Sequence, residues 1–310
     1  MPSPKPGMEL AALVELYAAE RLPSPKTIRN QKTVARLFAR DTGITHTADI
    51  TKGALLQWRD EILARASRTT WNTYLREMRT LLNFAVSTGR VNHNPFLEVG
   101  SLRTAYRRKK TVDGDLLHHA ISVLTSPNNP LNPGWFWTIV VRTFYYTGMR
   151  RRQLVHLRWS HANLDEGVLR LMAEGSKTRR EWDIPLVPNL VDDLRVLRDR
   201  TVAMCGSEIS ELQIFNACLF NTRYRGPETT EEQVSGFFRR LSGIVSREQG
   251  RPIRITPHRL RHTMATHVAA QGDIKSLQTI LGHTDARMTM EYIQPDITTM
   301  RSMLCALPRL

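Results

Sequence analysis

Cysteine is scarce in this chain, and its spacing shows no pairing pattern. Cys205, Cys218 and Cys305 are the cysteines in 310 residues, and none stands in a CxxC pair. An odd, sparse set excludes a disulfide-rich secreted scaffold and suits a reducing cytosol. The N-terminal sequence MPSPKPGMEL also lacks the apolar core of an export signal. These absences predict a cytoplasmic protein.

Long apolar runs, internal repeats and low-complexity segments are lacking too. No apolar run approaches the roughly 20 residues that are needed to span a bilayer, so we expect no association with a membrane. The absence of repeats excludes solenoid and propeller arrays. Apolar residues still make up 41% of the 310 residues, which is enough for the cores of roughly two domains.

Acidic residues are outnumbered by basic ones. The chain has 29 Asp and Glu against 44 Lys and Arg, which gives a formal net charge of +15. A chain this basic usually binds a polyanion such as nucleic acid. A basic surface that is merely solvated is the alternative interpretation.

The pattern of residues 8–98 predicts an all-helical domain. Hydroxyl residues stand where helices should begin, at Ser24 before Pro25, at Thr51 and at Ser67. The helix after Ser24 has one apolar face and, opposite it, a stripe of cations without an acid: Lys26, Arg29, Lys32, Arg36 and Arg40. We interpret this stripe as a face that follows a phosphate backbone, rather than as an ordinary solvated face.

Further cations follow along the chain. Arg68, Arg76 and Arg79 belong to the helix after Ser67, where contacts to DNA and simple solvation are equally plausible. Residues 99–112 have the composition of a linker, and their charge run consists of Arg107, Arg108, Lys109 and Lys110. Such a run is usually solvated, but between two domains of a basic protein it could also cross a DNA groove or backbone.

Residues 113–310 predict a second, mixed domain. Two short strands are expected at 168–172 and 182–186, joined by the turn GSKTRR. Helical patterns are found at 115–124, 135–148, 189–200, 231–248 and 257–270, and from Arg150 to about His156. The expected fold is therefore mainly α with a small β-sheet.

The motif TPHRLRHT combines an imidazole with a guanidinium at a helix start. Thr256 can cap a helix whose first residue is proline. His258 and Arg261 then lie on one face near its positive end, where the imidazole could relay a proton while the guanidinium binds two phosphate oxygens. A capping histidine with a structural arginine is the alternative. His258 and His262 have the spacing of metal ligands, but the arginines beside them and the missing third ligand argue against zinc.

The motif LGHTDARMTMEY places a tyrosine close behind a histidine. Gly282 should end a helix, His283 should follow in the turn, and Thr284 could cap a short helix that carries Tyr292. A tyrosine in such a place is more often a core residue. A phenol, whose pKa is ordinarily about 10, needs cationic neighbours to attack a phosphodiester at neutral pH. Those neighbours could be Arg150 of YYTGMR, Arg261, His258 and His283.

Lys177 lies in the turn GSKTRR between the two expected strands. A lysine in a turn is usually solvated, but on a hairpin it could also enter a groove and protonate a leaving oxygen. No cluster of carboxylates that would hold a divalent metal accompanies these motifs. Together they predict phosphoryl transfer through a covalent phosphotyrosine, without a metal or any other cofactor.

In this order, YYTGMR…LRW, SKTRR…IPL, TPHRLRHTMATH, LGH and the trailing Tyr292 resemble the tyrosine recombinase (phage integrase) family. The resemblance covers nearly the whole chain, and the combination of HRLRHT, LGH and a tyrosine nine residues after His283 is highly specific. It implies a helical, SAM-like core-binding domain at 8–98, a basic linker at 99–112 and a catalytic domain at 113–310. It also implies that the two domains form a C-shaped clamp around duplex DNA.

The resemblance further implies a role for each matched residue. Arg150 and Arg261 would hold the scissile phosphate and stabilise its transition state. Lys177 would protonate the 5′-hydroxyl leaving group, and Tyr292 would form a 3′-phosphotyrosyl bond. His258 would relay the proton of the nucleophile, and His283 would donate to a phosphate oxygen. Religation with a partner strand would then proceed through a Holliday junction, without ATP.

Two further residues are expected to support these groups without contacting DNA, and one assignment has competitors. Gln153 stands where the family usually has Glu or Asp, and its amide could still orient the site by hydrogen bonding. His262 is the second supporting residue. Arg179 and Arg180 lie close enough to Lys177 to compete for its role.

The resemblance also implies assembly of several copies. Apolar residues recur at helical intervals in the tail, at Ile297, Met300, Met303, Leu304 and Leu307. This tail helix could pack on its own domain. In the family such a helix often docks on a neighbouring subunit, which predicts a homotetramer on two DNA sites, formed by exchange of C-terminal tails.

The sequence thus predicts a site-specific recombinase of double-stranded DNA in the cytoplasm, associated with the nucleoid and typical of a mobile element. Its reaction would be integration, excision or resolution. Because the core-binding helices begin almost at once, we expect no additional arm-site domain. Two other functions stay open: DNA relaxation of the type IB topoisomerase kind, and sequence-specific regulation by a DNA-binding protein with a decayed active site.

Overall fold

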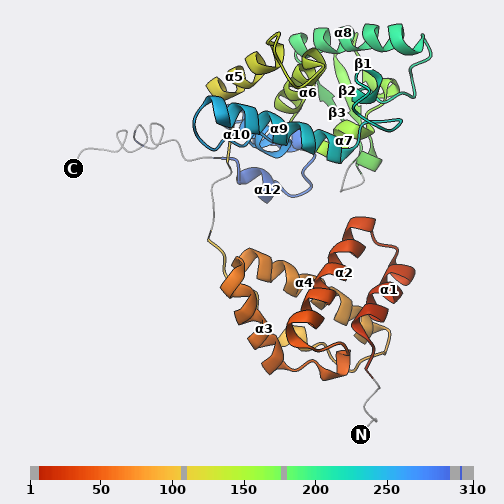
Figure 1. Ribbon diagram of the computed structural model, residues 1–310, viewed down its shortest axis with the longest axis vertical. Helices are drawn as coiled ribbons and strands as arrows, with labels where there is room; N and C mark the ends of the chain where they lie inside the picture. Colours follow the sequence, from red (N-terminus) through yellow and green to blue (C-terminus); the bar gives the residue numbers. More distant parts are fainter. Residues whose placement is uncertain (1–6, 106–109, 176–179, 294–300, 302–310) are drawn as a thin grey trace. The chain divides into compact units, whose positions relative to one another are not determined.

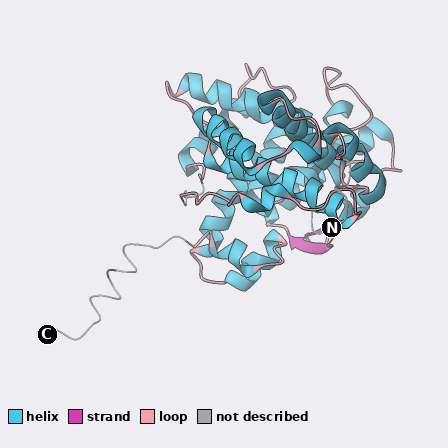
Figure 2. Ribbon diagram, turned by 90° about the horizontal axis from the view of Figure 1, so that it is seen from below, coloured by secondary structure: helices cyan, strands magenta, loops and turns pink. Residues whose placement is uncertain are grey.

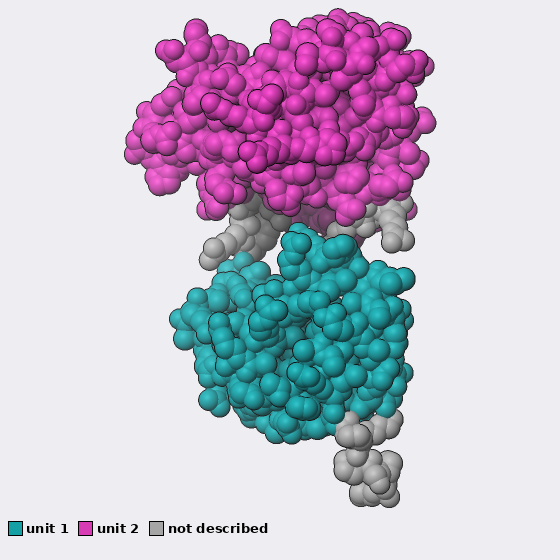
Figure 3. Space-filling model, turned by 45° about the vertical axis from the view of Figure 1, so that its right-hand side comes forward, with its two compact units in different colours: residues 1–107 teal, residues 108–310 magenta. Residues whose placement is uncertain are grey.

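The computed structural model describes residues 7–105, 110–175, 180–293 and 301. It divides into two compact units, residues 1–107 and 108–310 (Figure 3). The division falls within the predicted linker at 99–112. Helices dominate the described residues (Figure 2), and none of these helices is long and apolar enough to cross a membrane. The predicted fold class, mainly α with a small β-sheet, is confirmed.

The described part of the first unit is built from four α-helices (Figure 1). Their bounds are α1 Leu10–Arg21, α2 Pro25–Thr42, α3 Lys52–Arg65 and α4 Arg68–Ser87. The predicted caps are confirmed, since the side chains of Ser24, Thr51 and Ser67 each accept a hydrogen bond from the backbone N–H three residues on. The hydroxyl residues thus fix where α2, α3 and α4 begin.

An aromatic cluster holds these helices together. The rings of Phe38 and Trp58 meet edge to face at 5.0 Å, and Trp58 meets Trp71 at 5.4 Å. Phe96, in a short 3₁₀ turn after α4, meets Phe38 at 5.7 Å. All four side chains are buried, so α2, α3, α4 and the turn share one core.

The second unit carries eight further α-helices among its described residues. Their bounds are α5 Gly114–Thr125, α6 Gly134–Thr147, α7 Arg151–His156, α8 Pro188–Cys205, α9 Glu231–Glu248, α10 Pro257–Ala269, α11 Ile274–Leu281 and α12 Ala286–Met290. The central helix is α6, which packs against α5, α8 and α10. Its Trp137 stacks on Phe237 of α9, with ring centroids 4.0 Å apart.

The sheet is antiparallel, with strand order β1 (Ala162–Asn163), β2 (Val168–Leu171) and β3 (Trp182–Pro185). In its register Leu169 faces Ile184 and Leu171 faces Trp182. The two predicted strands are confirmed. The sequence did not predict β1, because two residues are too few to show an alternating pattern.

Gly148 ends α6 with a left-handed conformation, φ +59°. A Cβ at this position would collide with the Met264 side chain of α10 and would lie 3.7 Å from Cγ of Arg261. Only glycine combines this backbone conformation with so close an approach. The end of α6, and with it the start of the segment that carries Arg150, is thereby held directly against α10.

Candidate active site

The side chain of Arg261 is the centre of the candidate site. It projects from the second turn of α10, which begins as predicted, since Thr256 Oγ1 accepts a hydrogen bond from the Arg259 backbone N–H at 3.2 Å. The Arg261 side chain is buried, and its Nη1 donates to the Gly148 carbonyl at 2.6 Å. Its Nη2 donates to the Leu281 carbonyl at 2.8 Å and lies 3.0 Å from His283 Nε2. These partners are neutral, so they hold the guanidinium without cancelling its charge.

Burial and, to a smaller extent, the nearby Arg150 guanidinium lower the pKa of Arg261 to about 10, against an opposing effect of Tyr292. The group therefore stays charged at neutral pH. A charged guanidinium in a poorly solvated position interacts more strongly with an anion than it would in water.

Arg150 lies directly before α7 and is half-buried. Its backbone N–H donates to Gln153 Oε1 at 2.6 Å, which fixes the start of α7. Burial lowers the pKa of Arg150, while Tyr292 raises it. Its Nη1 is buried and has no hydrogen-bond partner among the described residues. Leaving a charged donor without an acceptor costs more than about 1 to 3 kcal/mol, so this atom is poised for an incoming oxyanion.

His283 follows Gly282, the left-handed residue that ends α11 as predicted. It is buried, and its Nδ1 lies 2.9 Å from Thr289 Oγ1. Burial first, and then Arg261 and Arg150, lower the pKa of His283 to about 4, against a smaller opposing effect of Glu291. The expectation that His283 would be a cationic neighbour of the phenol is therefore wrong at neutral pH, because two guanidinium groups beside a buried imidazole disfavour its protonation.

Tyr292 lies in the same chain as the two arginines and close to them. Its phenol interacts electrostatically with both Arg261 and Arg150. The ring stacks on His283 with centroids 6.1 Å apart and meets His262 at 5.4 Å. Only 5% of the residue is exposed. The structure thus brings the predicted nucleophile to the predicted phosphate-binding groups.

Two details of this segment differ from the prediction. Tyr292 lies two residues beyond the end of α12 instead of within it. The cap of α12 is Asp285, whose Oδ1 accepts from the Arg287 N–H at 2.9 Å, instead of Thr284. Both residues can cap a helix, and the sequence alone does not distinguish between them.

The two histidines of HRLRH form a row of rings that leads to the phenol. His258 is exposed in the first turn of α10, and its ring centroid lies 4.1 Å from that of the buried His262. The ring of His262 in turn contacts Tyr292. His262 thus lies against the tyrosine itself. In the part of the chain that the structure describes, no three His, Cys, Asp or Glu side chains gather as metal ligands would.

Several predicted residues fall outside the described residues. They are Lys177 and its competitor Arg179, the linker residues Arg107, Arg108 and Lys109, and the tail residues Ile297, Met300, Met303, Leu304 and Leu307. Lys110 and Arg180 are described and exposed. Gly175, which precedes the turn of Lys177, packs against Gln153, and a Cβ there would lie 3.1 Å from Gln153 Cα.

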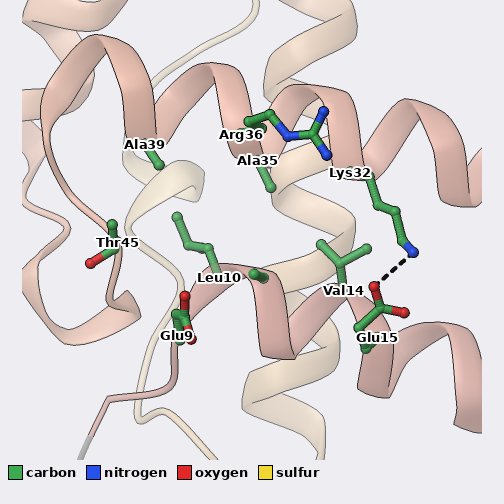
Figure 4. A pocket seen from close by; sticks show the side chains of 10 residues that line it. Glu9, Leu10, Val14, Glu15, Lys32, Ala35, Arg36, Ala39 and Thr45 are labelled. Atoms are coloured by element: carbon green, nitrogen blue, oxygen red, sulfur yellow. Dashed lines mark ion pairs between the residues drawn. The ribbon is translucent and has the colours of Figure 1, made fainter.

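The basic stripe of α2 is largely accessible. Lys26, Arg29, Arg36 and Arg40 are exposed, but Lys32 is half-buried. Acids from outside the stripe neutralise part of it, since Lys32 pairs with Glu15 of α1 at 2.7 Å in the pocket between the two helices (Figure 4). Arg40 pairs with Asp41, also at 2.7 Å. Lys26, Arg29 and Arg36 are therefore the better candidates for contacts with phosphates.

The three arginines of α4 differ from one another. Arg79 donates from Nε to the Phe96 carbonyl at 3.0 Å and from Nη2 to the Val99 carbonyl at 2.5 Å, so it fastens the turn after α4. Arg68 donates to the Arg103 carbonyl at 3.3 Å, and the exposed Arg76 pairs with Glu77 at 3.2 Å. Arg79 therefore supports the fold, which the sequence did not indicate.

Trp182 was not identified from the sequence, although it borders the site. From the first position of β3 it donates to the Ile280 carbonyl of α11 at 3.2 Å. Its indole covers Gly282, where any Cβ would collide with the ring. No local pattern could have shown this contact, since the two residues are a hundred positions apart.

This chain is similar to known proteins in both sequence and fold. Residues 135–298 match the model of the phage integrase family. A Pseudomonas syringae protein assigned to tyrosine recombinase XerC is 30% identical over 96% of this chain and 64% of its own length. A Pseudomonas aeruginosa relative of the same assignment is 31% identical over 89% of this chain and 66% of its own. The chain thus spans about two thirds of the length of these relatives. Tyrosine recombinase XerC of Yersinia pestis is 28% identical over 93% of this chain and 90% of its own length.

Solved structures share the fold. The integrase of transposon Tn1549, solved with a circular intermediate DNA, superposes with a TM-score of 0.76 at 16% identity and covers 97% of this chain and 100% of that one. A lambda integrase tetramer bound to a Holliday junction gives a TM-score of 0.69 at 19% identity, over 93% of this chain and 78% of that one.

The contact between Gly282 and Trp182 predicts a large effect of a small substitution. We expect Gly282→Ala to lower the free energy of unfolding by about 2 to 4 kcal/mol, because strain at φ +60° adds to overpacking against a rigid indole. Gly250→Ala is the matched control, with φ +62° and no atom within 4 Å of the added Cβ, and it should cost only about 1 kcal/mol. Urea unfolding measures both, and equal losses would contradict the contact.

The lowered pKa of His283 predicts how stability depends on pH. The unfolded chain binds a proton on this residue near pH 6.5, whereas the folded protein does so only near pH 4. The free energy of unfolding should therefore fall as the pH decreases from 6.5 to 4, with a contribution from His283 of about 2 kcal/mol. Urea unfolding of His283→Gln should show a smaller fall than the parent protein. Substitution of the exposed His118 by Gln should leave the parent's dependence unchanged.

Proposed function

Because this chain belongs to the phage integrase (tyrosine recombinase) family, we propose that it performs site-specific recombination of double-stranded DNA through a covalent 3′-phosphotyrosyl intermediate. The observation that carries this proposal is the position of the buried Tyr292 phenol, which interacts electrostatically with both Arg261 and Arg150. A buried phenol that interacts electrostatically with two guanidinium groups is placed to attack a phosphate that both of them bind.

In the proposed reaction Arg150 and Arg261 bind the non-bridging oxygens of the scissile phosphate. The Tyr292 oxygen forms a bond to phosphorus, and the bond from phosphorus to the 5′-oxygen breaks. The phenol proton passes to His258, for which the ring of His262 offers a route, and Lys177 protonates the leaving 5′-oxygen. The 5′-hydroxyl of a partner strand then reverses these steps. The energy of the broken bond is kept in the phosphotyrosine, so neither a cofactor nor ATP is needed.

The neutral imidazole of His283 serves to orient other groups of the site. It lies beside Arg261 and stacks on Tyr292, so it can orient both groups without adding a charge. Gln153 supports the site through its hydrogen bond to the Arg150 backbone. An amide there forms the same contact as a carboxylate would, but it leaves the charge of Arg150 uncompensated.

We also propose how the protein meets DNA and its own copies. The exposed cations of α2 would bind the phosphate backbone, helped by those of the segment 99–112. Four copies on two sites would assemble through their tail helices, as a homotetramer in the cytoplasm at the nucleoid. The tetrameric state of the lambda integrase complex, which shares the fold, supports this assembly.

Covalent trapping tests the proposed chemistry. The full chain is incubated with nicked suicide duplexes that contain a site enriched by this protein from random DNA. We expect a protein–DNA adduct that resists denaturing detergent, and its complete loss in Tyr292→Phe. Tyr146→Phe, a change at an exposed tyrosine of α6, should form the adduct as the parent does. If the parent forms no adduct on its enriched site, the protein is a DNA-binding regulator instead.

The same proteins distinguish recombination from simple relaxation. A topoisomerase needs no paired target sites, so it would efficiently relax a supercoiled plasmid that lacks the enriched site. We expect little relaxation of that plasmid, but recombinant products from a plasmid with two such sites. Relaxation without target sites would show topoisomerase activity.

Salt dependence tests the role of α2. The logarithm of the DNA-binding constant should fall linearly with the logarithm of salt concentration, with a slope of about −0.9 for each phosphate contacted. Arg29→Ala and Arg36→Ala should each make this slope about 1 unit less steep. Arg59→Ala is the control, since Arg59 pairs with Asp60 on α3 at 2.9 Å and lies outside the stripe. If all three variants keep the parent slope, α2 does not track the backbone.

A further inference from the structure

Thr289 lies at the centre of a ring of contacts that joins the candidate catalytic groups. The residue is fully buried on α12, and its Oγ1 lies 2.9 Å from His283 Nδ1. Its backbone carbonyl accepts from the Tyr292 N–H at 3.0 Å. Arg261 closes the ring, because its Nη2 lies 3.0 Å from His283 Nε2 and its guanidinium interacts electrostatically with Tyr292. One threonine therefore connects the imidazole to the segment of the nucleophile.

The donors and acceptors of this ring determine where the proton of His283 lies. A guanidinium can only donate, so Nε2 of His283 must accept from Arg261. A neutral imidazole then carries its proton on Nδ1, which donates it to Thr289 Oγ1. The charged and titratable groups that interact with the His283 imidazole are Arg261, Arg150, Glu291 and the stacked Tyr292. Together with burial, they keep the imidazole neutral.

We propose that Thr289 is a positioning residue whose hydroxyl holds His283 in the Nδ1–H form in the DNA-free protein and allows it to change form when DNA binds. A threonine hydroxyl can accept or donate. When a phosphate oxygen takes over the Arg261 N–H that faces Nε2, the Thr289 hydroxyl can rotate and donate to Nδ1. One proton leaves Nδ1 to solvent and one is taken up from solvent at Nε2. The imidazole remains neutral, and its Nε2–H can then donate to a phosphate oxygen.

The change that DNA binding would cause at His283 rests on the proposed function. The position of the proton in the DNA-free protein can be tested without any activity. The full chain is labelled with 15N-histidine and studied without DNA at neutral pH, with His283→Gln to assign the signals. We expect a protonated Nδ1 and an unprotonated Nε2 for His283, with slow exchange of the Nδ1 proton. A protonated Nε2 in the free protein would overturn the proposal.

Two substitutions at position 289 separate the hydroxyl from the shape of the side chain. Thr289→Val keeps the shape but removes the acceptor, so exchange of the Nδ1 proton should become much faster. Thr289→Ser keeps the hydroxyl and should preserve the parent spectrum. If the Nδ1 proton of the valine variant exchanges as slowly as that of the parent, the Thr289 hydroxyl does not hold the His283 imidazole.

Adduct formation on the suicide duplex tests the change that DNA binding would cause at His283. Thr289→Val should form the covalent adduct roughly tenfold more slowly, as expected for the loss of about one hydrogen bond, while it binds the duplex with parent affinity. Thr289→Ser should restore a rate near that of the parent. Equal rates for the parent and the valine variant would refute the role of Thr289. Absence of any parent adduct would refute the recombinase proposal instead, and the histidine spectra would still decide where the proton lies.

Discussion

The buried guanidinium of Arg261 is the interaction on which the site depends. It is held by the carbonyl that ends α6, the carbonyl that ends α11 and the imidazole of His283. Burying a cation is costly, and hydrogen bonds to neutral dipoles offset that cost without removing the charge. The same bonds bring the end of α6, which is distant in sequence, and the end of α11 together at α10. Positive charge and correct geometry at the site therefore have a single structural origin.

The sequence predicted much of the local structure, because local structure depends on local signals. Ser24, Thr51, Ser67 and Thr256 each stand before a helical pattern, and each caps the helix that follows. The family and the fold class were also predicted, from motifs whose order along the chain is specific. The strand β1 was missed, since it has only two residues.

Properties that depend on distant partners could not be predicted in this way. The sequence identified His283 but not its neutral state, which results from burial beside two guanidinium groups. It showed five cations on α2 but not that Glu15 of α1 pairs with Lys32. It treated Arg79 as accessible, whereas its guanidinium is engaged by two carbonyls. In each case the partner comes from another segment, so helical periodicity carries no information about it.

The indole of Trp182 covers Gly282 and is fastened to α11 by its own hydrogen bond. The first residue of β3 and the turn before His283 must therefore move together as one body. A mutation at either position changes what the other can tolerate. Among related sequences the two positions should covary: where a smaller residue replaces the tryptophan, the left-handed position gains room for a side chain such as asparagine, which accepts that conformation more readily than most others.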